Sequence, residues 1–108
     1  MKRIYVAHPY NGKEINKTRV EEFIRKMVKN NTDIMPVSPI HAMGYLYNDV
    51  GYEQGMQYCL ELLKTCDELL LCEGWEESIG CKMEKAYAEN HGIPINYVYT
   101  FNREEVGQ

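Results

Sequence analysis

A chain of 108 residues, 44% hydrophobic and 26% charged, predicts one soluble globular domain with a single core and no room for a second. The formal net charge is −4 and no dense Lys/Arg cluster occurs, which argues against binding to a nucleic-acid backbone and favours a small ligand. No apolar run reaches roughly 18 residues, and Met1-Lys2-Arg3 leads into a predicted strand rather than a signal peptide, so we expect no membrane span and a cytoplasmic location.

Apolar residues follow strand spacing and helix spacing in alternation along the chain. The first strand is stopped by Pro9 and the Asn11-Gly12 turn signal, and the last helix ends at Gly92 with Pro94 just beyond. The predicted elements are, in chain order, a strand over residues 3–8, a helix over 15–30, a strand over 33–37, a loop over 38–51, a helix over 52–65, a strand over 68–73, a helix over 79–90 and a strand over 95–99. We expect a domain over residues 1–101 and a polar tail over 102–108.

Four strands separated by three helices predict a flavodoxin-like or Rossmann-like α/β fold, a three-layer sandwich with helices on both faces of a parallel sheet. Right-handed crossovers favour the strand order 2-1-3-4. This order reverses between strands 1 and 3, and such sheets bind ligands beyond the carboxyl ends of the strands at the switch point. Those ends are followed by residues 7–12 and 72–78, so we expect His8, Tyr10 and Gly74 beside a ligand.

Aromatic residues near the predicted site allow two interpretations. Trp75 has a face on which a base could stack, and it could equally cover the core or contact another subunit. The loop over residues 38–48 carries Met43, Tyr45, Leu46 and Tyr47 and is too apolar for a solvated loop, so we expect it to cover the ligand or meet another subunit. Nine tyrosines in the chain favour a homodimer or a higher homo-oligomer.

The last predicted helix begins at a serine. Ser78 is a favoured N-cap residue, and the N–H groups of Ile79 and Gly80 lie at the positive end of the helix dipole. Together they predict an anion site that suits a phosphate, or a site for a sugar hydroxyl. Glu84 lies about one and a half turns further along the same helix.

Helical geometry separates Glu84 from the other faces of this helix. The predicted core face consists of Ile79, Met83, Ala86 and Tyr87, and the charged face of Lys82, Lys85 and Glu89. Glu84 shares its row with small residues that leave room for another molecule, namely Gly80, Cys81 and Ala88. Glu84 is therefore either a carboxylate directed at a ligand or a solvated side chain paired with Lys85 or Lys82.

The cysteines and histidines show no pattern of metal ligands. The four cysteines form no C-x-x-C pair and lie within or beside apolar segments, which favours reduced core residues at Cys59, Cys66, Cys72 and Cys81. The histidines are widely spaced and lack a carboxylate cluster, at positions His8, His41 and His91. We therefore predict neither a metal nor a cofactor.

Several motifs of the chain carry a resemblance. They are RIYVAHPYNG at residues 3–12, CDELLL at 66–71, GWEES at 74–78, the Ser-x-Gly-x-x-x-Glu spacing of Ser78, Gly80 and Glu84, and the continuation through Ala88 and GIP at 92–94. With these motifs, over nearly its whole length, the chain resembles the nucleoside 2-deoxyribosyltransferase superfamily, and within it a branch of small domains found in bacteria and their phages. The Ser-x-Gly-x-x-x-Glu spacing is similar to that of the 2′-deoxynucleoside 5′-monophosphate N-glycosidases, which are N-hydrolases of this superfamily.

The resemblance implies cleavage of an N-glycosidic bond with retention, in which Glu84 is the nucleophile and forms a glycosyl-enzyme. It implies that Tyr5 orients Glu84, that Ser78 and Gly80 hold a 5′-phosphate, and that Gly12 lets the backbone approach the ligand. From the residues alone, Tyr5 could equally be a core tyrosine, Ser78 a helix cap and Gly12 a turn residue. The implied partner is a small nucleotide or nucleoside, and similar superfamily members complete their sites across a dimer.

The chain departs from the superfamily at Cys59. Enzymes of the superfamily carry an aspartate near the end of the second helix, where it handles the sugar hydroxyl and the leaving base, and counting back from Asp67 places Cys59 there. Asp67 itself matches a structural position at the start of the third strand. Protonation of the leaving base then needs another acid, for which His8, His41 and Asp49 are the candidates.

Two hypotheses follow from these residues. The first is an enzyme, a nucleotide N-glycosidase or a deoxyribosyltransferase-like protein that uses Glu84. The second is a binding module that retains the pocket and senses or sequesters a nucleotide-derived small molecule without turnover. The cysteine at position 59 favours the binding module, whereas Tyr5, Ser78 and Glu84 together favour the enzyme.

Overall fold

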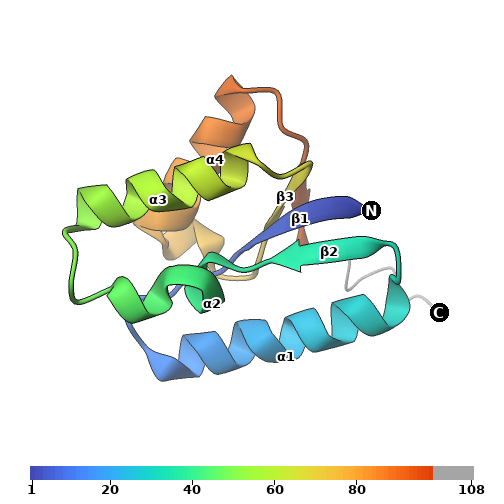
Figure 1. Cartoon of the computed structure of the whole chain (residues 1–108), viewed down its shortest axis with the longest axis horizontal. Helices are drawn as coiled ribbons and strands as arrows, with labels where there is room; N and C mark the ends of the chain where they lie inside the picture. The colour runs from blue at the N-terminus through green and yellow to red at the C-terminus, as the bar shows by residue number, and fades with distance from the viewer. Residues whose placement is uncertain (99–108) are drawn as a thin grey trace.

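The computed structural model of the protein describes residues 1–98, in which helices lie on both sides of a parallel sheet (Figure 1). Its elements are β1 (Lys2–Ala7), α1 (Glu14–Asn30), β2 (Ile34–Val37), α2 (Pro39–Met43), η1 (Gly44–Leu46), α3 (Tyr52–Lys64), β3 (Glu68–Leu71), η2 (Trp75–Glu77), α4 (Ile79–Asn90) and β4 (Ile95–Tyr97), where η denotes a 3₁₀ helix. Three expectations lie outside the described residues: a last strand reaching Tyr99, a domain end at residue 101 and the polar tail.

The sheet confirms the predicted topology. Its four strands run parallel in the order β2-β1-β3-β4. Asp67 has the structural role expected at the start of β3, because its Oδ2 accepts a hydrogen bond of 2.8 Å from the backbone N–H of Arg3. The ends of β1 and β3 lie side by side, with Ala7 paired to Leu71. The predicted switch point is therefore present, and both strands deliver the following loops to the same edge.

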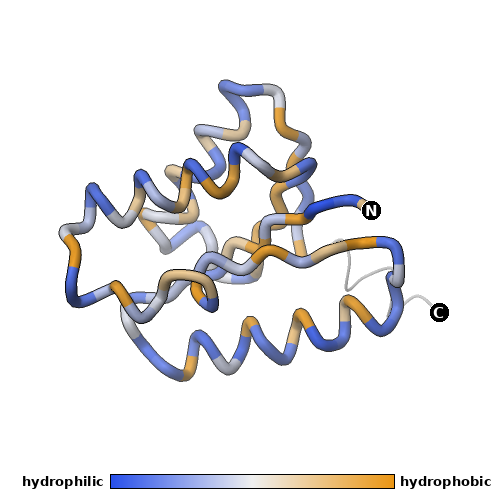
Figure 2. Tube along the Cα trace, in the orientation of Figure 1, coloured by the Kyte–Doolittle hydropathy of each residue, from blue (hydrophilic) through white to orange (hydrophobic). Residues whose placement is uncertain are grey.

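The strand residues alternate between two cores, as expected for a sheet covered on both faces. One core packs Tyr5, Ala7, Leu69 and Leu71 with residues of α3 and α4. The other packs Ile4, Val6 and Leu70 with Val20 and Met27 of α1. Figure 1 shows α1 on the side of the sheet opposite α3 and α4, and in Figure 2 hydrophobic and hydrophilic positions alternate along α1, as in an amphipathic helix.

The segment over residues 38–51 differs from the predicted loop because it contains the helices α2 and η1. Ser38 caps α2, its Oγ accepting a hydrogen bond of 3.3 Å from the N–H of His41. Pro39 occupies the first helical turn, where a missing N–H costs nothing. The local signal for a helix start was thus present, but α2 is only five residues long and its apolar pattern is too short to show a period.

The predicted core face of α4 is wrong except at Tyr87, which is partly buried and packs against the core. The buried residues of this helix are Cys81, Glu84 and Ala88, whereas the side chains of Ile79 and Met83 are 67% and 40% exposed. Small side chains at Cys81 and Ala88 face the sheet, and Glu84 lies on the same buried face of the helix.

Within residues 1–98, none of the helices has the length and hydrophobicity that a membrane span requires.

Candidate active site

A cavity of about 470 Å³ lies at the switch point, beyond the ends of β1 and β3. Its walls come from the segment after β1, from α2 and η1, from α3 and from the first turns of α4. The sequence-predicted residues that line it are His8, Tyr10, Ser78, Gly80 and Glu84. This volume is within the range of small-molecule sites, which are typically about 300–1,000 Å³.

Glu84 is the buried carboxylate of this cavity. Its side chain lines the cavity wall although the residue is only 5% exposed. The alternative of a solvated glutamate is wrong because Glu84 is buried, and Lys85 forms its ion pair with Glu89 instead, at 2.8 Å. Burial raises the pKa of Glu84 from its ordinary value of 4.5 to about 7, against the opposing effect of a hydrogen bond from Tyr5. Near neutral pH the carboxyl group is therefore poised between its charged and neutral forms.

Tyr5 supplies that hydrogen bond from the sheet beneath. It is fully buried in β1, and its hydroxyl donates to Oε2 of Glu84. Burial, followed by the nearby charge of Glu84, raises the pKa of Tyr5 well above its ordinary value. The hydroxyl therefore keeps its proton and can only stabilise the charged form of Glu84 by donating to it. One strand and one helix thus hold the carboxylate in a defined position.

The start of α4 combines a helix cap with a glycine in the cavity wall. The Oγ of Ser78 accepts a hydrogen bond of 3.1 Å from the N–H of Cys81, as a helix N-cap does. A Cβ on Gly80 would lie 3.4 Å from Sδ of Met56 and 3.6 Å from the hydroxyl oxygen of Tyr52. Because residue 80 is a glycine, no side chain projects into the cavity beside the first turn of α4.

His8 and Tyr10 line the cavity from the segment after β1. The Nδ1 of His8 lies 2.7 Å from the carbonyl oxygen of Pro9, which can only accept, so Nδ1 carries a proton and Nε2 of the neutral ring is an acceptor. Burial lowers the pKa of His8, with a smaller contribution in the opposite direction from the Pro9 carbonyl. Tyr10 packs edge-on against Tyr47, with ring centroids 5.4 Å apart.

Cys59 of α3 also lines the cavity. Burial and then the charge of Glu84 raise its pKa to about 11, so the thiol is protonated at neutral pH. The side chain at this position therefore brings no charge to the cavity. The same helix contributes Tyr52, Met56 and Tyr58 to the wall.

Three predicted binding residues lie outside the cavity lining. Gly12 has φ +69°, and a Cβ there would lie 2.9 Å from the Tyr47 ring, so this glycine supports a wall residue. Gly74 has φ +92° and forms the turn into η2. Trp75 packs on Tyr97 with ring centroids 5.7 Å apart and is not placed for stacking on a base in this cavity.

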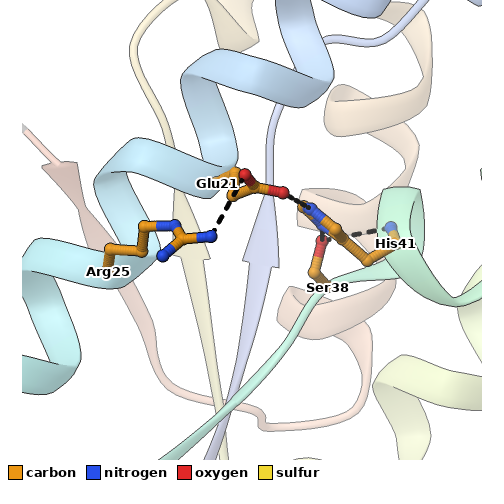
Figure 3. Close-up of polar contacts among 4 residues, drawn as sticks. All are labelled: Glu21, Arg25, Ser38 and His41. Atoms are coloured by element: carbon orange, nitrogen blue, oxygen red, sulfur yellow. Dashed lines mark hydrogen bonds and ion pairs between the residues drawn. The ribbon is translucent and has the colours of Figure 1, made fainter.

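His41 belongs to a separate groove of about 610 Å³ beside α1 and β2. Figure 3 shows its ring between two partners, with Nδ1 at 2.8 Å from Oγ of Ser38 and Nε2 at 3.1 Å from Oε1 of Glu21. Glu21 also pairs with Arg25 at 3.5 Å. His41 therefore links α2 to α1 and does not face Glu84, and the exposed Asp49 does not line the cavity either. Of the three candidate acids, the structure leaves His8 in the cavity.

Within residues 1–98, no group of three or more His, Cys, Asp or Glu side chains is arranged to hold a metal ion. The four cysteines are free thiols. Three of them are buried, at Cys66, Cys72 and Cys81, and Cys59 is partly buried.

Comparison with known proteins identifies the family of the chain. The family described as "Domain of unknown function (DUF4406)" matches residues 2–97. The chain belongs to this DUF4406 family. No curated protein matches the sequence.

One similar solved structure is the 2-desoxiribosyltransferase from Leishmania mexicana, with a TM-score of 0.67 and 20% sequence identity. The match covers 90% of this chain and 63% of that enzyme, so the DUF4406 chain spans less than two thirds of its length. At this identity the likeness shows a common α/β fold, in agreement with the fold predicted from the sequence.

The sequence prediction for this DUF4406 chain missed much of the cavity wall. The loop over residues 38–48, for which a cover over a ligand was one of two expectations, contributes Pro39, Ile40, Met43, Leu46 and Tyr47 to the wall. The lining residues without a prediction include Val50 and, from α3, Tyr52, Met56 and Tyr58. Glu77, before the cap of α4, also lines the cavity; it lies in the segment over residues 72–78 expected at the switch point, but it was not singled out as a site residue.

Proposed function

We propose that this protein cleaves the N-glycosidic bond of a nucleotide or nucleoside, with Glu84 as the nucleophile. The observation that carries the proposal is the Glu84 carboxylate, 5% exposed, hydrogen-bonded to Tyr5 and lining a ligand-sized cavity at the switch point. Burying a carboxylate costs free energy, and strongly perturbed groups in cavities mark candidate functional sites. The resemblance and the fold shared with a 2-desoxiribosyltransferase support the same activity.

In the proposed reaction, an oxygen of Glu84 bonds to the anomeric carbon while the bond from that carbon to the base nitrogen breaks. The base leaves with the electron pair and takes up a proton. Water, or the nitrogen of a second base, then displaces Glu84 and restores the free carboxylate. The hydrogen bond from Tyr5 holds the Glu84 oxygens in place during both steps.

His8 is the proposed source of the proton, because it is the candidate acid that lines the cavity. The reactive form would combine a charged Glu84, whose pKa is about 7, with a protonated His8, whose pKa is lowered by burial. Glu84, which must be charged, has a higher pKa than His8, which must be protonated. Only a small fraction of the protein therefore has a charged Glu84 and a protonated His8 at the same time. The expected pH profile is bell-shaped, with its maximum on the acidic side of pH 7.

Phosphate recognition is proposed at the first turn of α4, where Ser78 and Gly80 lie beside the helix amides. The described residues that line the cavity include no lysine or arginine. A 5′-phosphate would therefore be bound at these amides without a lysine or arginine, and nucleosides and their 5′-monophosphates should be compared directly.

The test is to incubate the protein with deoxy- and ribonucleosides and their 5′-monophosphates and to measure free base by chromatography. Base release that is lost in Glu84→Gln supports the proposal, with Glu89→Gln on the exposed side of α4 as the matched control. Unchanged release by Glu84→Gln would contradict the role of Glu84. A second base added as acceptor distinguishes transfer from hydrolysis.

A binding module is the second candidate, and Cys59 is the observation that favours it. The resemblance places a carboxylate at this position, whereas the cavity of this protein has a protonated thiol there. A module of this kind predicts ligand-induced thermal stabilisation with the ligand recovered intact. Cys59→Asp is the informative variant, because base release gained by this substitution would show that the wild-type cavity binds without turnover.

We also propose that the protein is at least a dimer. Large apolar side chains remain exposed on α3 and α4 beside the cavity, namely Tyr52, Tyr58, Ile79 and Met83. Exposed groups of this kind mark contact surfaces between proteins. Light scattering coupled to gel filtration should give a mass of at least two chains, and Ile79→Glu should reduce it. A single-chain mass at high protein concentration would contradict the proposal.

A further inference from the structure

The cavity that holds Glu84 has an unbalanced set of charges. Two acidic side chains line it, the buried Glu84 and the exposed Glu77. Among the described residues of the lining there is no lysine or arginine, and His8 is neutral near pH 7 because burial lowers its pKa. Arg19 is close enough to disfavour the charged form of His8, but it does not line the cavity. The cavity is therefore negative and attracts a ligand that carries a positive charge.

Four tyrosines give this cavity a wall that suits a flat cation. Tyr10 comes from the segment after β1, and Tyr47 follows η1. Tyr52 and Tyr58 come from α3. The rings of Tyr47, Tyr52 and Tyr58 remain exposed, so their faces are not occupied by core packing. Aromatic faces stack on flat rings and also attract positive charge, which makes a charged heterocycle a better ligand for this wall than a neutral one.

The same lining offers little acid to a leaving base. Cys59 lies where the resemblance implies an aspartate, and its pKa of about 11 makes the thiol a weak acid. Burial likewise raises the pKa of Tyr52. A neutral base, which must take up a proton in order to leave, therefore depends on the rare form of the protein in which His8 is protonated. A base that already carries a positive charge needs no proton.

We infer that this cavity takes a nucleoside whose base is positively charged, such as an N-alkylated purine or a pyridinium ring, held by the tyrosine wall and the acidic lining. Cleavage of this ligand rests on the proposed function, whereas the preference for a charged ring does not. In the cleavage, an oxygen of Glu84 bonds to the anomeric carbon, and the electron pair of the broken bond cancels the positive charge of the base, which leaves neutral. Water then displaces Glu84 and gives a proton to the solvent.

The first experiment measures binding with probes that have no glycosidic bond. They are 1-methylnicotinamide, a flat ring with a fixed positive charge, and its neutral isostere 3-methylbenzamide. Each is titrated into the wild-type protein by NMR near pH 8, where Glu84 is mostly charged because its pKa is about 7. We expect the cation to bind at least about tenfold more tightly. Equal affinity, tighter binding of the neutral ring or no measurable binding of the cation would overturn the inference.

Glu77 allows one negative charge to be removed from the lining while Glu84 stays in place. Glu77→Gln should reduce the preference for the cation about threefold. The matched control is Glu76→Gln, because this residue is also exposed, lies next to Glu77 and does not line the cavity. The control should keep the wild-type preference. Equal preferences in the two variants would show that the cavity lining does not select the charge, and would overturn the inference.

A separate experiment connects this ligand class with the proposed function. Guanosine and 7-methylguanosine differ by one methyl group, and at about pH 6 only the methylated base is positively charged. Base release from each is measured by chromatography and divided by its release without protein. We expect this ratio to be at least about tenfold larger for 7-methylguanosine and to be lost in Glu84→Gln. An equal or larger ratio for guanosine would overturn the inference and leave the glycosidase function standing. Release of neither base, together with preferred binding of the cation, would overturn the glycosidase function and leave the charge preference standing.

Discussion

Replacing Glu84 by glutamine is expected to stabilise the protein at neutral and alkaline pH. Glutamine has nearly the same shape, can accept the hydrogen bond from Tyr5 and never carries a charge. The wild-type carboxylate, by contrast, must be charged in a site that is only 5% exposed. The residue proposed to act as nucleophile is thus expected to lower the stability of the fold.

The magnitude follows from the pKa of Glu84, about 7 in the folded protein against an ordinary value of 4.5. The difference of about 2.5 pH units, at about 1.36 kcal/mol per unit, gives about 3 kcal/mol. Because the folded pKa is the higher one, this penalty is fully present above about pH 7. It decreases as the pH falls and is absent below about pH 4.5, where the carboxyl group is protonated in both states.

The assay is urea unfolding of the wild type, Glu84→Gln and the exposed control Glu89→Gln between pH 5 and pH 8. The stability advantage of Glu84→Gln over the wild type should grow by about 2–3 kcal/mol across this range. For a domain of this size such a difference corresponds to a Tm increase of roughly 10 °C or more. An advantage that does not depend on pH would refute the reasoning, because it would show that the Glu84 carboxyl group titrates normally.

Three further substitutions test the frame of the site. Ser78→Ala should lower the free energy of unfolding by about 1 kcal/mol in urea titrations, because α4 loses its cap. Gly12→Ala should cost at least about 1 kcal/mol in the same assay, since its φ is +69° and the new Cβ would meet the Tyr47 ring at 2.9 Å. Glu21→Gln removes the charge of the side chain that contacts His41 and thereby weakens the link between α1 and α2. The KM or Kd for a ligand of the cavity should rise severalfold, while Tm changes little. A loss of Tm equal to that of a core variant would contradict this prediction.

The fold could be predicted because its signals are local. The apolar run before Cys72, the turn signal at Asn11-Gly12 and the Gly92-Pro94 stop determine where elements begin and end. A chain of alternating strands and helices then has few possible parallel topologies. The missed α-helix, α2, is short, and its start is marked only by Ser38 and the following proline.

The site could be predicted only in part, because its key contacts join distant residues. The N-cap at Ser78 is a local signal, and it was recognised. The hydropathy pattern of α4 predicted Ile79 in the core and Glu84 outside it. In the structure the opposite face of the helix packs against the sheet, so Ile79 is exposed and Glu84 is buried. The buried Glu84 is hydrogen-bonded to Tyr5, which lies 79 positions earlier in the chain. The spacing of apolar residues along a sequence cannot indicate a partner that far away.

His41 shows the same limit for a binding residue. The sequence offers it as an acid of the site, and its position in a separate groove depends on Glu21 of α1, twenty positions earlier. Trp75 likewise packs against Tyr97 of a strand that follows it by a whole helix. Residue type alone therefore identified candidate groups, and the packing of α1, α2 and α4 decided which of them share the cavity.

The central claim is that Glu84 attacks the anomeric carbon, and the most direct test is to trap the glycosyl-enzyme. The protein should be incubated with nucleosides and nucleotides whose sugar carries fluorine at the 2′ position, which slows release of the intermediate, and then analysed intact by mass spectrometry. The account predicts a mass increase equal to the glycosyl group, located on Glu84 by peptide mapping and absent in Glu84→Gln. Base release without an adduct on Glu84, or with an adduct on another residue, would contradict it.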